Sequence, residues 1–453
     1  MQLLTSILGF ILLQVQQVPV PKDIPLPLPL PEWLLVFLLV VSFLVHILFI
    51  NLMFGGTLLT LFFEILGYIK KNEEYDKLSL EIAKTTTVNK SMAVVMGVAP
   101  LLTINTLYTV YFYSANALTG LMWIMIIPLV TISFLLLYAH KYTYEILRNN
   151  KPLHISIVAL AAALFLFIPL IFLTNVNLMI QPEKWLMVKG FLSALMLPNV
   201  WPRYFHFIFA SLAVTGLFLF WWFSRKPYLY EESFKNLQKH DLQKRFYSIT
   251  FFASVSQFLM GPIVLLTLPE KGITWTMILV ILTGAAIALP ALYYLWKEIT
   301  GDEKLIGKKF PWIAGCLTVT VIFMGSGRHL YRAASLEGHQ KLVKKKTEEY
   351  IKAVEEAQQE ALHPKPDTSQ KVLLSPGELV YANNCKACHD IHVKLVGPPF
   401  TEAAQIYKGN KPGLISWIKK PGKKREGPQM PAQDKLTNQE LSDVADWILS
   451  LNK

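Results

Sequence analysis

Long apolar segments recur through the first two thirds of the chain and constrain its fold more than any other feature. A helix needs about 20 predominantly apolar residues to cross the hydrocarbon core of a bilayer. Eight segments approach or exceed this length, in a chain that is 53% hydrophobic and 16% charged. The pattern predicts an all-α polytopic membrane bundle. The expected spans lie near residues 34–68, 91–114, 119–139, 153–175, 204–223, 247–268, 274–296 and 310–326.

A ninth apolar run occupies the start of the chain, at residues 2–18. It lacks the basic start that a secretory signal peptide carries. Residues 1–18 are therefore interpreted either as a signal peptide or as an uncleaved N-terminal anchor helix, and the sequence does not decide between the two.

Basic residues predict the orientation of the bundle. The loops at 69–90, 140–152, 224–246 and 297–309 together hold 18 Lys and Arg, whereas the opposite loops hold 5. Lys and Arg concentrate on the cytoplasmic side of a membrane. Eight crossings then leave the C-terminal tail outside the cytoplasm, which predicts a bacterial inner membrane with this tail in the periplasm.

The C-terminal tail contains a C-x-x-C-H sequence, from Cys385 to His389. Two thiols at this spacing can bond one haem covalently, and the adjacent histidine can then bind the iron. The alternatives are a zinc site or a redox-active C-x-x-C pair. Covalent haem attachment takes place outside the cytoplasmic membrane, so this motif agrees with the orientation that the basic loops predict.

A second axial ligand is expected downstream. Met430 is the best candidate, because the prolines on either side would hold it on a stiff extended loop. Apolar residues at helical spacing follow between residues 436 and 451. Residues 375–453 therefore resemble a small class I cytochrome c. The resemblance implies a six-coordinate iron, bound by His389 and Met430, that transfers electrons without binding substrate.

Residues 337–371 join the last span to this domain and are rich in Lys, Glu, Gln and Ala. They are predicted to form a semi-rigid helical linker, with a disordered tether as the alternative.

The net charge of +12 includes a basic cluster before Met430. That cluster predicts docking with an acidic redox partner. The alternative is an ordinary solvated loop with no partner. Nucleic-acid binding is not expected on this side of a membrane. The residues of the cluster are Lys419, Lys420, Lys423, Lys424 and Arg425.

Two histidines within predicted spans, His46 and His206, are candidate ligands of membrane haems. Polar groups in spans are costly and usually functional, and a neutral imidazole can bind haem iron. The alternative is that each is hydrogen-bonded within the bundle and has no metal.

The neighbouring residues favour haem. His46 is followed by Gly55 and Glu64, and His206 is followed by a glycine ten residues later. These spacings make residues 33–300 resemble subunit I of cytochrome bd oxidase. The resemblance implies that His46 binds a high-spin haem where substrate binds, and that His206 binds a low-spin haem together with a methionine. Met277 is the best match for that methionine, with Met260 and Met324 as rivals.

Three departures separate the chain from this family pattern. Asn105 stands where the family has a glutamate beside the oxygen-reducing haem, and a second family glutamate falls near Tyr113. The long quinol-binding loop is absent, since only residues 267–272 stand in its place. A cytochrome c domain is appended instead. The resemblance therefore implies that electrons enter through haem c and not from quinol, and it leaves oxygen reduction in doubt.

The eighth span ends in a group of basic residues, Arg328, His329 and Arg332. His329 could bind a further haem or replace the methionine, and the two arginines could pair with haem propionates. The alternative is a basic collar that ends the helix at the membrane surface. Cys316 is interpreted as an inert core residue.

The expected function is respiratory electron transfer from haem c to b-type haems in the membrane, within a cytochrome bd-like terminal reductase subunit that uses a soluble donor. The alternatives are a non-catalytic electron conduit in a larger complex, and a membrane anchor that presents cytochrome c. Membrane lipid, and other membrane subunits or a homologous subunit, are the other expected partners.

Overall fold

The computed structural model describes residues 28–225, 228, 230, 234–362, 374–422 and 429–451, with the backbone alone described for 87–91 and 361–362. The N-terminal run 1–18 and the basic residues Lys423, Lys424 and Arg425 lie outside the described residues. The chain divides into two compact units, Met1–Ala353 and Val354–Lys453.

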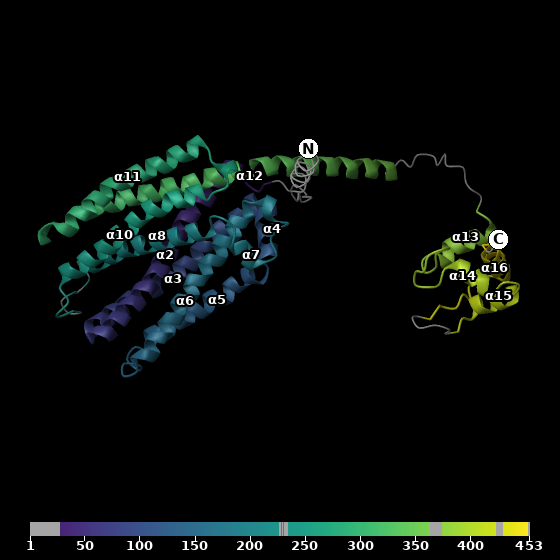
Figure 1. The fold of residues 1–453 in the computed structure, drawn as a ribbon, viewed down its shortest axis with the longest axis horizontal. Helices are drawn as coiled ribbons and strands as arrows, with labels where there is room; N and C mark the ends of the chain where they lie inside the picture. Colours follow the sequence, from purple (N-terminus) through teal and green to yellow (C-terminus); the bar gives the residue numbers. More distant parts are fainter. Residues whose placement is uncertain are drawn as a thin grey trace, which may run out of the picture. The chain divides into compact units, whose positions relative to one another are not determined.

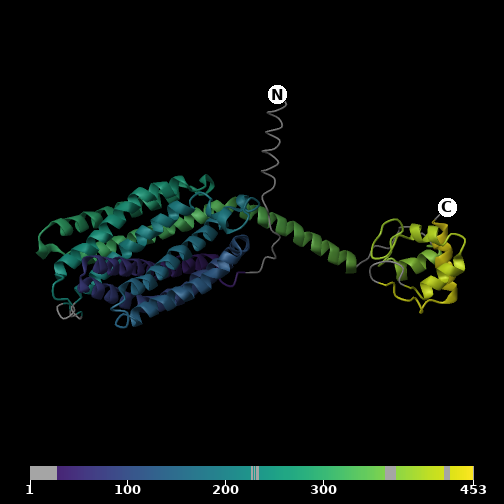
Figure 2. The same cartoon turned by 60° about the horizontal axis from the view of Figure 1, so that its bottom comes forward.

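The first unit is a bundle of long helices that lie side by side with their axes nearly aligned (Figures 1 and 2). Its main helices are α2 (Glu32–Lys70), α3 (Glu73–Leu107), α4 (Thr109–Thr119), α5 (Leu121–Tyr142), α6 (Lys151–Met179), α7 (Phe191–Leu195), α8 (Val200–Ser224), α10 (Lys239–Leu266), α11 (Trp275–Thr300) and α12 (Phe310–Leu362). Short 3-10 turns lie at Pro182–Lys184, Glu270–Gly272 and Glu303–Leu305.

Seven of the described helices are long and apolar enough to cross a membrane, and the protein is therefore a multi-pass membrane protein. The eighth predicted span, 91–114, is not one straight helix. It is split at Tyr108 into the end of α3 and the whole of α4, which meet at an angle of 110°. The prediction of eight spans agrees with the structure only when this bent pair counts as one span.

Large apolar side chains on the outer faces of the bundle are exposed. Ile127, Leu259 and Leu266 have 74%, 70% and 84% of their surface uncovered by the protein. In water such faces would be unstable, whereas lipid covers them without cost. We call the end of the bundle that carries the loops after α2, α5, α8 and α11 the basic-loop end.

Helix α12 is far longer than a membrane needs, at 53 residues. Its first half packs within the bundle, and from Lys341 onward most of its described side chains are exposed. The predicted linker therefore begins as an unbroken continuation of the last membrane helix. Residues 363–371 of that linker lie outside the described part of the chain.

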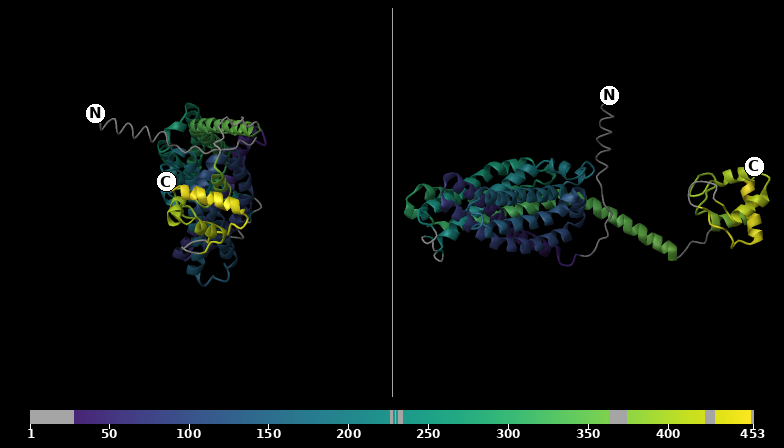
Figure 3. Two further views of the ribbon diagram at one scale, coloured as in Figure 1. Left: turned by 90° about the vertical axis from the view of Figure 1, so that its right-hand side faces the viewer. Right: turned by 90° about the horizontal axis from the view of Figure 1, so that it is seen from below.

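The second unit contains the short helices α13 (Pro376–Val380), α14 (Phe400–Ile406), α15 (Lys411–Lys419) and α16 (Asn438–Ser450), with a π-helical turn at Tyr381–Cys385. Figure 3 shows it as a compact helical group. Its core joins all four helices through Val380, Phe400, Leu414, Leu441 and Val444. Apolar residues of α16 recur at three and four positions, which buries one face of this helix.

A capping box begins α16. The Thr437 backbone N–H donates to Oε2 of Glu440 at 2.8 Å, and the Glu440 N–H donates to the Thr437 hydroxyl at 3.2 Å. These bonds to Thr437, first from its backbone and then from its hydroxyl, lower the pKa of Glu440. The box therefore stabilises this helix most when Glu440 is ionised.

We expect Glu440→Gln to lower the melting temperature of the second unit near pH 7 but not near pH 3. In the folded unit the pKa of Glu440 lies below its ordinary value, so the charged carboxylate stabilises the fold at any pH above that ordinary value. This stabilisation is lost as the pH falls through the lowered pKa. Thermal unfolding at the two pH values measures the effect. Asp434→Asn, which removes one charge from an exposed side chain outside the box, is the control. An equal effect of Glu440→Gln at both pH values would contradict the prediction.

Candidate functional site

The C-x-x-C-H motif begins at the end of the π-helical turn. Cys385 is buried and Cys388 is exposed, and burial raises the pKa of the Cys385 thiol to about 11. The backbone N–H groups of Cys388 and His389 both donate to the Cys385 carbonyl, at 3.0 and 2.9 Å. One tight turn therefore holds both thiols and the imidazole.

The ring of His389 is fixed on two sides. It stacks on Phe400, with ring centres 4.9 Å apart, and its Nδ1–H donates to the Pro398 carbonyl at 2.8 Å. This hydrogen bond leaves Nε2 as the nitrogen with a free lone pair, which suits an iron ligand. A Cβ at Gly397 would lie 2.6 Å from both ring nitrogens, so only glycine permits this approach of the backbone.

Met430, the predicted second ligand, is half-buried on a loop. Its neighbour Gln429 donates from its side chain to the Pro421 carbonyl at 3.1 Å, and the Gln433 backbone N–H donates to the Ile418 carbonyl at 3.3 Å. These bonds anchor the loop on both sides of Met430. Its role as an axial ligand stays a prediction.

A cavity of about 410 Å³ lies inside the bundle, between α2, α3, α5, α6 and α12. Its walls are mostly apolar, with Phe43, Trp123 and Phe172 among them. The ionisable groups in its lining are His46, Arg328, His329 and Arg332. Four candidate residues from two distant parts of the chain thus meet around one space.

His46 is oriented by the neighbouring helix α3. Its Nδ1–H donates to the Ala93 carbonyl at 2.9 Å, which leaves Nε2 free to bind a metal. Gly97 makes room for the ring, because a Cβ there would lie 2.8 Å from Cε1 of His46. The same two features, a carbonyl partner for Nδ1 and a glycine against the ring, hold His389 in the second unit.

The two arginines add positive charge without acidic partners. Arg328 lies over the ring of Phe43 at 5.0 Å, and Arg332 lies over Tyr108 at 5.4 Å. Arg203 from α8 is within electrostatic range of Arg328. No ion pair with Asp or Glu joins any of the three among the described residues. Arg332 is buried and the other two are half-buried, and guanidinium groups in such surroundings favour an anionic ligand.

The other predicted haem ligands lie outside this cavity. His206 is on α8, and its buried Nδ1 has no hydrogen-bond partner among the described residues. Met277 is fully buried at the start of α11, in a cluster with Ile104, Tyr108 and Tyr331. Met260 and Met324 lie half-buried on α10 and α12. The pairing of His206 with a methionine stays a prediction.

Two expectations about polar residues change with the structure. Asn105 does not line the cavity, although its neighbour Ile104 does, and its side-chain amide donates to the Leu101 carbonyl at 2.8 Å. The position of Glu64 near the end of its span predicts a carboxylate that reaches water at the membrane surface, with a role in a proton path as the alternative, and the first of these is wrong. Glu64 is 1% exposed and contacts two histidines, His140 and His154, that were not predicted as functional.

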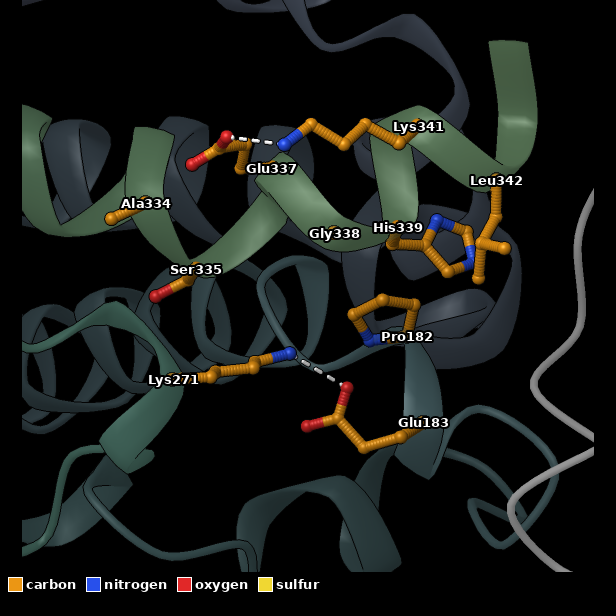
Figure 4. A pocket seen from close by; sticks show the side chains of 10 residues that line it. All are labelled: Pro182, Glu183, Lys271, Ala334, Ser335, Glu337, Gly338, His339, Lys341 and Leu342. Carbon is orange, nitrogen blue, oxygen red and sulfur yellow. Dashed lines mark hydrogen bonds and ion pairs between the residues drawn. The ribbon is translucent and has the colours of Figure 1, made fainter. Parts of the chain in front are cut away.

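A second cavity of about 460 Å³ lies at the other end from the basic loops. Figure 4 shows its charged side chains paired with each other: Lys271 with Glu183, and Lys341 with Glu337, each at 2.7 Å. His339 bonds to the Tyr111 hydroxyl at 3.1 Å. The charged residues of this lining are thus neutralised within it, whereas those around His46 are not. The cavity at His46 is the better candidate for an anionic cofactor.

Comparison with known proteins agrees with the two-unit division. Residues 374–452 match the family model described as "Cytochrome c". Cytochrome c-552 of Hydrogenobacter thermophilus is 38% identical over 78 residues, which are 16% of this chain and 79% of that protein. Cytochrome c-551 of Pseudomonas denitrificans is 34% identical over 77 residues, 16% of this chain and 94% of that protein.

The membrane unit has the fold of bd oxidase. The structure of bd oxidase from Geobacillus thermodenitrificans superposes with a TM-score of 0.52, covering 67% of this chain and 87% of that chain. The sequence identity is 13%, so the likeness concerns the fold alone. The protein combines a bd-like membrane bundle with a C-terminal cytochrome c domain, which implies covalent haem c.

We expect Gly397→Ala to lower the amount of covalently bound haem c, because the added methyl group would displace the ring of His389. Overpacking of this kind costs about 1–3 kcal/mol of folding free energy. Pyridine haemochrome spectra and thermal unfolding measure both effects. The control is Gly422→Ala, whose Cβ would meet Trp417 at an ordinary 3.5 Å. Normal haem content and stability in Gly397→Ala would contradict this assignment.

Proposed function

We propose, on the premise that residues 374–452 belong to the cytochrome c family, that this chain is a respiratory electron-transfer subunit with a second haem site in the cavity at His46. Haem supplies a reversible one-electron carrier at each site, and an open coordination position in the membrane would let a small molecule such as oxygen bind. The cavity at His46 is the observation that carries the proposal.

Three properties of that cavity fit a haem. His46 offers Nε2, because Nδ1 is already bonded to Ala93. The apolar walls match a macrocycle, and they exclude water from it. Arg328 and Arg332 supply guanidinium groups that bind carboxylates such as haem propionates in a bidentate manner. His329 lies in the same lining and is a candidate for a further axial ligand.

The cytochrome unit would receive electrons from a soluble donor. Cys385 and Cys388 would hold haem c, and His389 and Met430 would bind its iron. Lys419 and Lys420 are exposed at the end of α15, which supports docking of an acidic protein. In the orientation that the basic loops indicate, this unit lies in the periplasm and the bundle lies in a bacterial inner membrane, next to other membrane subunits.

His206 is the candidate ligand for an additional low-spin haem, with Met277 as its possible partner. Nδ1 of His206 is buried with no hydrogen-bond partner among the described residues, which is costly, and a ligand at this ring nitrogen would remove that cost. A b-type haem at His206 and a second at His46 would give the membrane unit two sites.

One observation favours a second function, that of a non-catalytic electron conduit. Among the described residues, the lining of the cavity at His46 contains no aspartate or glutamate. Reduction of oxygen consumes protons, and carboxylates are the usual groups that deliver them within membranes. A chain without such groups at the cavity could pass electrons to another subunit without itself reducing a substrate.

We expect purified protein to contain covalent haem c and at least one haem that acid acetone extracts. His46→Ala should lower the extractable haem while leaving haem c unchanged, because the cavity loses its axial ligand. Pyridine haemochrome spectra of the pellet and the extract measure both pools. His240→Ala, on α10 outside the cavity, is the matched control. Protein that carries only the covalent haem would refute a membrane haem site and leave an anchor for cytochrome c.

Carbon monoxide separates the reductase from the conduit. A substrate-reducing haem has an open coordination position and binds carbon monoxide, whereas a six-coordinate carrier does not. We expect a carbon monoxide difference spectrum in the wild type that disappears in His46→Ala and persists in the control. A wild-type protein with extractable haem but no such spectrum would favour the conduit.

A further inference from the structure

A buried cluster of three side chains lies at the basic-loop end, away from the cavity at His46. Glu64 comes from the last turns of α2, His140 from the end of α5 and His154 from the start of α6. Their exposed fractions are 1%, 0% and 1%. One donor atom from each residue falls within 4.8 Å of the other two. Three helices therefore converge on one point.

The hydrogen bonds of His154 determine which of its nitrogens can bind a ligand. Its Nε2–H donates to the backbone carbonyl of His140 at 2.8 Å. In the neutral ring, Nδ1 then carries a lone pair, and this atom touches Oε1 of Glu64. Two lone pairs in contact repel each other, so either a proton or a metal cation must be shared between them. A backbone carbonyl on the second nitrogen is also the usual environment of a metal-binding histidine.

His140 completes the set. Its Nε2 lies 2.6 Å from Oε2 of Glu64, and its ring stacks on His154 with centres 4.1 Å apart. Its Nδ1 is buried with no partner among the described residues. Without a metal, a proton on His154 and the Nε2–H of a neutral His140 would both donate to Glu64; with a metal, Nε2 of His140 would offer its lone pair as a third ligand.

We propose that Glu64, His140 and His154 form a binding site for a divalent transition-metal cation. Two imidazoles and one carboxylate are a ligand set that Zn²⁺ and other first-row divalent cations accept. The cation removes the cost of a carboxylate buried without full compensation. It also ties α2, α5 and α6 together, next to the ion pair between Lys151 and Asp76 at 3.0 Å. The proposal is independent of haem at His46.

Zinc retention tests the site in the full-length protein in detergent. The protein is treated with a chelator, loaded with ZnCl₂ and desalted, and zinc is measured by mass spectrometry relative to covalent haem c. We expect about one zinc per haem c in the wild type. In Glu64→Gln and His154→Gln, affinity should fall about tenfold or more, since even the loss of an outer partner of a ligand has that effect. His240→Gln, a histidine of the same end of the bundle, should behave as the wild type.

X-ray absorption at the zinc edge of the wild type gives a result that does not depend on the variants. We expect nitrogen and oxygen ligands near 2.0–2.1 Å with the outer-shell pattern of imidazole. Thiolate ligands near 2.3 Å would place the zinc at a cysteine and overturn the proposal. Equal zinc in wild type and triad variants, or none in the wild type, would also overturn it, because the cluster would then be a proton-bridged ion pair.

Discussion

A polar side chain inside the hydrocarbon core of a membrane finds no water and must meet a partner from the protein. Most polar groups of this bundle obey that constraint. Asn51 accepts from Ser211 at 2.9 Å between α2 and α8, and Asn175 donates to Asn116 at 2.7 Å between α6 and α4. Several buried polar atoms have no hydrogen-bond partner among the described residues, and those of His206 and His329 are among them. Together with the guanidinium groups that lack acidic partners at the cavity, these two imidazoles support the places proposed for a cofactor.

The helical bundle could be predicted from sequence because membrane spans are read from apolar length alone. Every predicted span overlaps a helix of the structure. The break at Tyr108 could not be predicted, because apolarity carries no information about the direction of a helix. The continuation of α12 beyond the membrane was expected only as a separate linker, since the change from apolar to charged residues signals a change of solvent and not the end of a helix.

The motif from Cys385 to His389 was readable because its chemistry depends on local spacing. The gathering of His46 with Arg328 and Arg332 depends on packing between α2 and α12, and it was not predicted from the sequence. His140 and His154 were not predicted because they lie at the ends of their spans, where a histidine can reach water and indicates no particular function. A signal was present in Glu64, since a carboxylate within an apolar segment requires a partner from elsewhere in the chain.

Helix α12 has a mechanical consequence. Arg328, His329 and Arg332 reach the cavity from the same unbroken rod that continues as the exposed stalk. An α-helix is stiff along its axis and resists twisting, since each turn is locked to the next by hydrogen bonds. A piston-like slide or a torque applied to the stalk would therefore be transmitted to these three side chains. A movement of the stalk along or about its axis would therefore also move part of the cavity lining.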